Sequence, residues 1–186
     1  MKVYVQVNEN NKVIACSFME NPDDIEVEVE DGVTDLLSYY LIDGKLVRDV
    51  GGILENEKNR KKEELNIACN EAILDGFVYE VNGEKYKFSF DTEAQFNFQG
   101  AERILSKGLV GDISWTVKKD DEYHRIKISK QTMDELMIVI FLHKDRNIRK
   151  YREMLIPMVE NANTVEEVQS VTWDSVTLSN EISTNI

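Results

Sequence analysis

The sequence contains few prolines and glycines, which interrupt regular structure, and few cysteines, which can form disulfides. Its 186 residues include 2 prolines and 9 glycines, too few for long flexible linkers. Its 2 cysteines, Cys16 and Cys69, lie far apart in apolar settings, which fits a reducing compartment better than a disulfide scaffold. We expect both to be buried as small apolar side chains. With 42% hydrophobic and 31% charged residues, the composition is that of a soluble globular protein.

Basic residues are also scarce. Lysine and arginine number 22 against 35 acidic residues, which gives a formal net charge of −13. Because a phosphate backbone is bound through a basic surface, this charge argues against a nucleic-acid partner, and residues 58–62 form the only dense basic run. The longest apolar run, 136–142, is far too short to span a bilayer. Strand-like sequence follows Met1 directly, so we expect neither a signal peptide nor membrane insertion.

The motifs of common catalytic sites are missing as well. The sequence has no Gly-rich phosphate loop, no Cys-x-x-Cys pair and no nucleophile elbow. His124 falls on a predicted strand and His143 on a predicted helix, and neither has a carboxylate spaced to orient it from the same element. Too few ligands gather for a metal. The sequence therefore predicts a protein that is not an enzyme, with no catalytic residue, no metal site and no cofactor.

Residues 1–50 have the alternation of a small β-rich unit. Strands are predicted at 1–7, 12–18 and 25–30, a short helical turn at 34–40, and a last hairpin at 41–47. The acidic alternation of the third strand, at Glu26, Glu28 and Glu30, is interpreted as a solvated sheet face. Carboxylates two apart on a strand lie roughly 7 Å apart, so they do not converge on one cation.

A boundary is predicted at Gly51-Gly52. Beyond it, residues 53–73 form one helix whose first half is almost wholly charged. In one interpretation that half stands in solvent or packs on another chain, and in the other it is a plain connector. The sequence does not favour one interpretation over the other. The folded module is predicted to span residues 53–174. The tail 175–186 is rich in serine, threonine and asparagine, and we expect it to be flexible or ordered by a partner.

Within the module, helices alternate with antiparallel hairpins. Asn82-Gly83 between two aromatic and β-branched runs is the strongest short-range hairpin signal, because a type I′ turn needs positive φ at both central positions. A helix follows at 92–107 and a second hairpin at 112–128. A long helix at 133–159, with its last turn disturbed by Pro157, precedes a short one at 164–171. The fold class predicted is α+β, with one four-stranded sheet backed by helices.

Five aromatic residues are candidates for interface or ligand contacts. Phe96 and Phe98 cannot both face one side of a helix, so one of them is expected at an interface. Exposed aromatics on the hairpins would serve a carbohydrate-binding module, and the candidates there are Tyr79, Tyr86 and Trp115. The amides of Gln95 and Asn97, near a helix start, are expected to bond to backbone groups of the adjacent hairpin rather than to a ligand.

A set of motifs between residues 65 and 115 resembles one known family. The set comprises Leu65-Asn66-x-Ala68-Cys69-Asn70-x-Ala72-Ile73-x-x-Gly76-Phe77, Tyr86-x-Phe88-Ser89-x-Asp91, Gln95-x-Asn97-Phe98-x-Gly100-Ala101 and Trp115. It is similar to a domain of unknown function found in tail-fibre and related tail proteins of bacteriophages and prophages, and the likeness extends to about Trp173. The first fifty residues resemble the short β-rich leader common in such phage proteins.

The resemblance implies a non-enzymatic structural component of a phage tail, namely a fibre, baseplate-associated or adaptor protein. Its partners would be other tail or baseplate proteins, a host surface receptor, and other copies of itself in a homotrimer. It would lie in the virion tail, after a period in the host cytoplasm before assembly. Two alternatives stay open: a tail-fibre assembly chaperone and a receptor or glycan-binding tail module.

Overall fold

The structure is a computed structural model that describes residues 1–30, 32–33 and 35–178. Position 31, at the end of the expected third strand, and position 34, in the expected helical turn, lie outside the described residues. So does the part of the expected tail from 179 to 186. The chain divides into two compact units. The first comprises Met1–Arg60 and Ala162–Gln169, and the second comprises Lys61–Asn161 and Ser170–Ile186.

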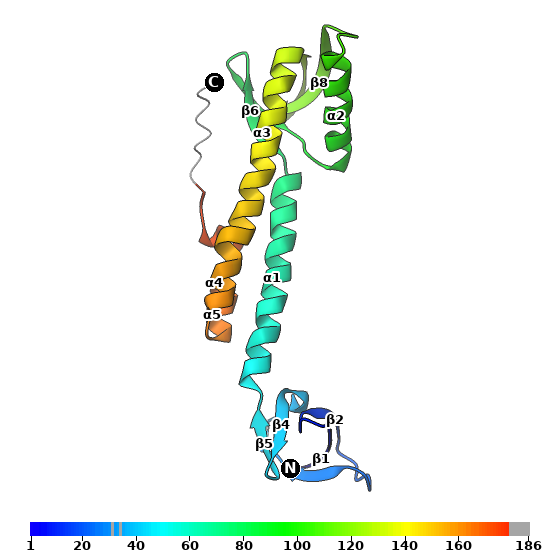
Figure 1. The fold of residues 1–186 in the computed structure, drawn as a ribbon, viewed down its shortest axis with the longest axis vertical. Helices are drawn as coiled ribbons and strands as arrows, with labels where there is room; N and C mark the ends of the chain where they lie inside the picture. Colours follow the sequence, from blue (N-terminus) through cyan, green and yellow to red (C-terminus); the bar gives the residue numbers. More distant parts are fainter. Residues whose placement is uncertain (31, 34, 179–186) are drawn as a thin grey trace. The chain divides into compact units, whose positions relative to one another are not determined.

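The first unit is built on a small antiparallel sheet and a hairpin (Figure 1). The sheet contains β1 (Lys2–Val7), β2 (Val13–Ser17) and β3 (Ile25–Glu28) in the order β2-β1-β3. The short 3-10 helix η1 (Leu36–Ser38) leads to the hairpin of β4 (Tyr39–Ile42) and β5 (Lys45–Arg48). The core of this unit consists of Val3, Val5, Val13, Val27, Val29 and Leu36. The β-rich character predicted for residues 1–50 is thus confirmed.

The two cysteines differ in exposure, and the prediction that both are buried is wrong for Cys16. Cys69 is buried, whereas Cys16 is exposed. Cys16 pairs with the fully buried Val5 on the edge strand β2, but unlike Val13 of the same strand it does not pack into the core of the unit. The acidic face of β3 is exposed as predicted, and Glu26 pairs with Lys2 at 2.6 Å.

Helix α1 (Val50–Leu74) begins three residues earlier than predicted and contains Gly51 and Gly52, where a boundary between units was expected. Asp49 explains the difference, because its Oδ1 accepts a hydrogen bond from the Gly52 N–H at 2.8 Å and caps the first turn. A Cβ at Gly52 would lie 2.2 Å from the Asp49 carboxylate, so glycine at this position permits the cap. Lys12 also pairs with Asp49 and holds the pKa of that carboxyl below its usual range.

The second unit contains the predicted four-stranded antiparallel sheet. Its strands are β6 (Phe77–Val81), β7 (Glu84–Phe88), β8 (Asp112–Lys119) and β9 (Glu122–Ser129), in that order across the sheet. Asn82 and Gly83 form the β6–β7 turn with φ of 54° and 82°, as a type I′ turn requires.

Helices α2 (Thr92–Ser106) and α3 (Lys130–Arg149) lie against this sheet and enclose the core of the unit (Figure 1). Asp91 caps α2 and Ser129 caps α3, each by accepting a backbone N–H bond with its side chain. The buried core residues are Cys69, Ile73, Phe77, Val81, Phe88, Phe90, Phe98, Ala101, Leu105, Val117, Ile128, Met133, Leu136, Val139 and Ile140.

The predicted long helix after Ser129 is divided. Beyond α3 the chain forms a π-helical segment, η2 (Lys150–Leu155), and then α4 (Ile156–Asn161). Pro157 has no N–H for the Glu153 carbonyl and its ring would clash there in a regular α-helix, and the widened turn lies immediately before it. The effect of Pro157 was expected on the last turn, and the structure places the irregularity one turn earlier.

The part of α1 in the second unit, from Lys61 onward, runs alongside α3 and η2. Tyr151 donates from its hydroxyl to the Lys62 carbonyl at 3.3 Å, and the Cys69 thiol donates to the Asn147 carbonyl at 3.5 Å. These contacts connect η2 and α3 to the helix that precedes the sheet.

The last described elements confirm the expected short helix. Helix α5 (Val165–Ser170) begins after Thr164, whose hydroxyl accepts the Glu167 N–H at 3.1 Å. A 3-10 turn, η3 (Trp173–Ser175), follows, and Trp173 packs against the core of the second unit with the Lys150 ammonium 4.4 Å from its ring centroid.

Candidate functional site

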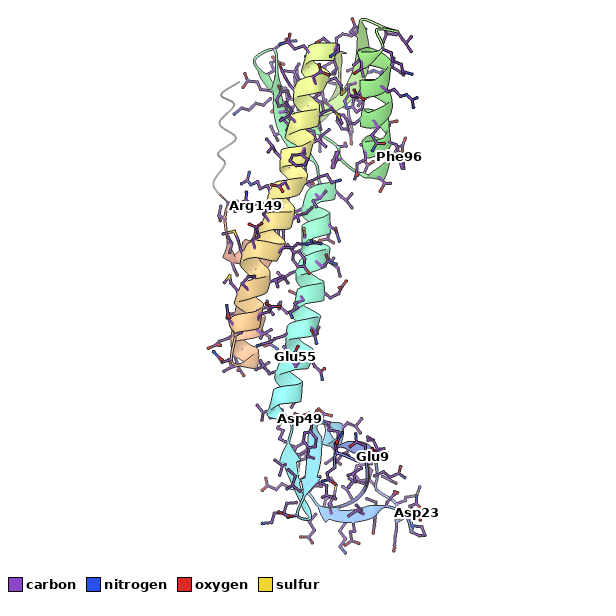
Figure 2. All side chains as sticks on the ribbon, viewed as in Figure 1. Glu9, Asp23, Asp49, Glu55, Phe96 and Arg149 are labelled. Carbon is purple, nitrogen blue, oxygen red and sulfur yellow. The ribbon has the colours of Figure 1, made fainter. Side chains whose placement is uncertain are left out.

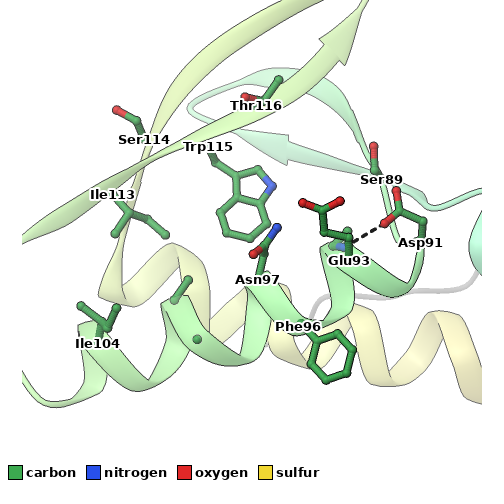
Figure 3. A pocket seen from close by; sticks show the side chains of 13 residues that line it. Ser89, Asp91, Glu93, Phe96, Asn97, Ile104, Ile113, Ser114, Trp115 and Thr116 are labelled. Atoms are coloured by element: carbon green, nitrogen blue, oxygen red, sulfur yellow. Dashed lines mark hydrogen bonds between the residues drawn. The ribbon is translucent and has the colours of Figure 1, made fainter.

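The second unit has an open groove between α2 and β8 (Figure 3). It encloses about 530 Å³. Its lining comes from the chain after β7, from α2 and from the first half of β8: Ser89, Asp91, Glu93, Ala94, Phe96, Asn97, Gly100, Ala101, Ile104, Ile113, Ser114, Trp115 and Thr116.

The groove exists because β7 separates from β8. The two strands are matched at one position, Lys87 opposite Lys118, and β7 ends at Phe88. Gly76, with φ of +89°, lies so close to the end of β7 that a Cβ there would be 2.0 Å from the Phe88 carbonyl oxygen. Where the chain leaves β7 for α2, the Gln95 amide donates to the Phe90 carbonyl at 3.1 Å.

The two phenylalanines of α2 have opposite environments, as their spacing predicts. Phe98 is 1% exposed and its ring centroid lies 4.4 Å from that of Trp115, so it supports the groove from the core side. Phe96 is 69% exposed and its side chain stands at the surface of α2 (Figure 2). Of this pair, Phe96 is therefore the residue available to a partner.

The remaining aromatic candidates are only partly gathered at the groove. Trp115 lines it, and its indole lies over α2 close to the Asn97 side chain (Figure 3). Tyr79 and Tyr86 are elsewhere in the sheet, and each hydroxyl already donates to a carboxylate: Tyr79 to Glu135 at 2.7 Å, and Tyr86 to Glu84 at 2.6 Å. Burial, followed by the bond to Glu135, raises the pKa of Tyr79 to about 12.

Small and polar residues of α2 complete the groove, and sequence reasoning missed most of them as site residues. Gly100 lies in the middle of α2, and a Cβ there would meet no atom within 4 Å. Glycine in a helix interior costs roughly 0.5–1 kcal/mol relative to alanine, and nothing described in this chain requires it there. A glycine in the middle of a predicted helix was the signal in the sequence for this part of the groove.

The two amides at the start of α2 have different roles. Gln95 serves the fold as expected, through its bond to Phe90. Asn97 was expected to bond to backbone too, but among the described residues it has no hydrogen-bond partner, and its amide extends toward the Trp115 ring (Figure 3). An exposed amide without a partner is available to a ligand.

The charge in the groove is concentrated at one end. Asp91 and Glu93 lie at the start of α2, beside Ser89, while Ile104 and Ile113 lie at the opposite end (Figure 3). The Asp91 carboxylate accepts the Ala94 N–H at 2.8 Å and so is partly engaged as a helix cap. The groove therefore offers negative charge at one end and an apolar surface at the other.

The histidines lie outside this groove. His143 packs against Phe77 and Phe90, with ring centroids at 5.7 and 6.1 Å, and its Nε2 lies 3.0 Å from the Ile73 carbonyl oxygen. His124 is exposed on β9. In the described part of the chain, no three side chains of the His, Cys, Asp and Glu types are placed to share a metal ion. Nor does any helix of residues 1–178, as far as they are described, have the length and apolar character to cross a membrane.

Comparison with known proteins gives one family. Neither the curated proteins nor the solved structures yield a match to this chain. The family model of the domain of unknown function DUF4376 matches residues 56–173, which include every residue of the groove. The chain belongs to the DUF4376 family.

Proposed function

We propose that this protein is a non-enzymatic structural component of a bacteriophage or prophage tail, as a fibre, baseplate-associated or adaptor protein. It acts through protein–protein contacts made in part by the groove between α2 and β8. The observation that carries the proposal is the open groove with exposed apolar residues at its rim, Phe96 at 69% and Ile104 at 42%. The resemblance of the Gly76-to-Trp115 motifs to phage tail proteins supports the setting.

The chemistry of the groove supports binding rather than turnover. Its only titratable side chains are the carboxylates of Asp91 and Glu93, and Asp91 caps α2. A hydrolytic site wants a nucleophile, a base within hydrogen-bond reach and an electrophilic helper. Apolar rims with a few polar groups are instead typical of surfaces that recognise another macromolecule.

The partners proposed are other tail or baseplate proteins, with a homotrimer and a host surface receptor as further contacts. The place of action is the virion tail, reached from the host cytoplasm. Quantitative mass spectrometry of purified particles from a producing strain tests this. A stoichiometric presence in multiples of three or six copies is expected. Absence from particles, with abundance in the lysate, would contradict the proposal and favour a tail-fibre assembly chaperone.

A receptor or glycan-binding module is the second candidate, favoured by one observation. Trp115, Asn97 and Glu93 bring an aromatic ring, an amide and a carboxylate to one surface (Figure 3), and a few such polar groups around an apolar wall can orient a small ligand. Asn97→Ala tests it, with Gln99→Ala on the same helix as the control. Loss of host-cell or glycan binding by the first variant alone supports this candidate, and equal binding by both opposes it.

A further inference from the structure

We propose that the groove between α2 and β8 receives an extended polypeptide strand, which pairs with the free edge of β8 and so fills the place that β7 leaves. The proposal deepens the proposed function, on which it rests, by naming the kind of segment that the assembly partner inserts. It rests on the unpaired backbone groups at the edge of β8, in addition to the apolar surface of the groove.

The edge is defined by unequal pairing on the two sides of β8. Toward β9, every residue from Asp112 to Lys119 has a partner. Toward β7, only Lys118 has one. The stretch 112–117 is therefore without a strand on that side among the described residues. Alternate residues of a strand direct both N–H and C=O to the same side, so about three residues here present donors and acceptors to the groove.

Other parts of the described chain do not occupy this edge. No backbone–backbone hydrogen bond from a turn or loop reaches residues 112–117. One side chain does approach it, since the Arg125 guanidinium donates to the Ser114 carbonyl at 3.3 Å. A carbonyl oxygen has two lone pairs, so this contact leaves an acceptor site for an incoming N–H.

The floor of the groove has room for the side chains of such a strand. Side chains of a strand alternate between its two faces, so every second one would point toward α2. There it would meet Ala94, Gly100 and Ala101, which are small, beside the wall formed by Trp115 (Figure 3). The space above Gly100 gives a physical reason for glycine at that position.

The distribution of charge specifies the chemistry of the occupant. Glu93 and Asp91 lie at the end of the groove where β7 departs, and Ile104 and Ile113 lie at the other (Figure 3). A complementary strand carries lysine or arginine at the first end and valine or isoleucine on the face toward α2. Pairing along residues 112–117 needs about six residues, which span roughly 20 Å in extended form.

A synthetic peptide tests the proposal on the full chain. The probe is fluorescein-labelled Lys-Thr-Val-Thr-Val-Thr with a C-terminal amide, in which the lysine and both valines lie on the face toward α2, and its binding is followed by fluorescence anisotropy. Two further peptides carry N-methyl groups on alternate backbone amides, one in each frame. Because a strand paired on one side uses alternate amides, methylation in one frame is expected to weaken binding at least 10-fold and methylation in the other to change it little. Equal binding of the two methylated peptides, or binding by none of the three, would overturn strand pairing.

A variant pair locates the binding on the protein. Gly100→Leu fills the floor of the groove and is expected to reduce peptide affinity at least 10-fold. Gln99→Leu makes the same kind of change on a part of α2 that does not line the groove, and it is expected to bind as the unaltered protein does. Thermal unfolding of both variants shows that they are folded. Unchanged affinity in folded Gly100→Leu would contradict the proposed location.

This test is separable from that of the proposed function. If the chain is present in particles but binds no strand peptide, the strand proposal alone is wrong. If the chain binds the peptide in the predicted frame but is absent from particles, the tail assignment is wrong and the groove remains a strand-binding site.

Discussion

The Gln95 side chain donates a hydrogen bond from Nε2 to the Phe90 carbonyl oxygen over 3.1 Å. This bond joins the start of α2 to the segment that has just left β7, at the point where the groove opens. The bond therefore contributes to the fold of the helix–hairpin junction next to the groove.

Loss of this bond has a modest and specific cost. Gln95→Ala is expected to lower the free energy of unfolding by about 1 kcal/mol, because the partly buried Phe90 carbonyl loses its donor. Urea denaturation measures the change. Gln99→Ala, on the exposed side of the same helix, should change stability by less than about 0.5 kcal/mol. Equal effects of the two substitutions would show that the bond contributes nothing.

Two glycines of the hairpin separate steric contact from backbone conformation. Gly76 and Gly83 both have positive φ, +89° and +82°. A Cβ at Gly83 would meet no atom within 4 Å, whereas one at Gly76 would lie 2.0 Å from the Phe88 oxygen. Gly83→Ala should therefore cost about 1 kcal/mol, and Gly76→Ala about 2 kcal/mol or more. Comparison of their urea midpoints gives the difference. A Gly76→Ala variant as stable as Gly83→Ala would contradict the close approach.

Truncation of the two phenylalanines of α2 should change the stability of the protein by very different amounts. Phe98→Ala removes a fully buried ring and is expected to destabilise the protein by about 3–5 kcal/mol. Phe96→Ala removes an exposed ring and should stay within about 0.5 kcal/mol of the unaltered protein. Thermal and urea unfolding test both. A large loss of stability in Phe96→Ala would mean that its ring packs within the fold.

The cysteines provide a chemical measure of local burial. Cys16 is exposed, whereas Cys69 is buried and burial raises the pKa of its thiol. A thiol-reactive chromophore should therefore modify one thiol rapidly in the native protein and both in denaturant. With Cys16→Ser, the rapid phase should disappear. Rapid modification of that variant under native conditions would contradict the burial of Cys69.

Tyr79 is expected to affect stability at high pH. Its pKa of about 12 lies above the value of about 10 in an unfolded chain, so the folded state holds the proton more tightly. Its contribution to stability is fully present below about pH 10 and is lost as pH rises from there toward 12. Spectrophotometric titration of the native protein should show a late-ionising tyrosine that is missing in Tyr79→Phe. Identical titration curves would contradict the raised pKa.

Local chemistry predicted much of the fold. Asn82-Gly83 specified the first hairpin of the module, local patterns predicted the helices at 92–107 and 164–171, and alternation predicted the strands of the four-stranded sheet. Each of these features depends on residues close together in the sequence. The start of α1 was predicted three residues too late, because the cap at Asp49 allows Gly51 and Gly52 to lie in the first helical turn.

The groove was less predictable, because it depends on contacts between distant segments. Strand β7 ends at Phe88 and is matched with β8 at one position, and no local pattern shows that β8 is therefore left partly unpaired. Phe96 and Trp115 were identified as candidates from residue type and spacing. Glu93, Gly100 and Ile104 were not, since their common location appears only when α2 lies against β8.

Photo-crosslinking in purified particles tests the central claim, that this groove docks another protein of the tail. Benzoylphenylalanine replaces Asn97 inside the groove, and in a matched variant it replaces Gln99 on the same helix outside it. We predict that irradiation crosslinks position 97 to an extended segment of another polypeptide of the particle and does not crosslink position 99. No crosslink from position 97, or the same crosslinks from both positions, would contradict the claim.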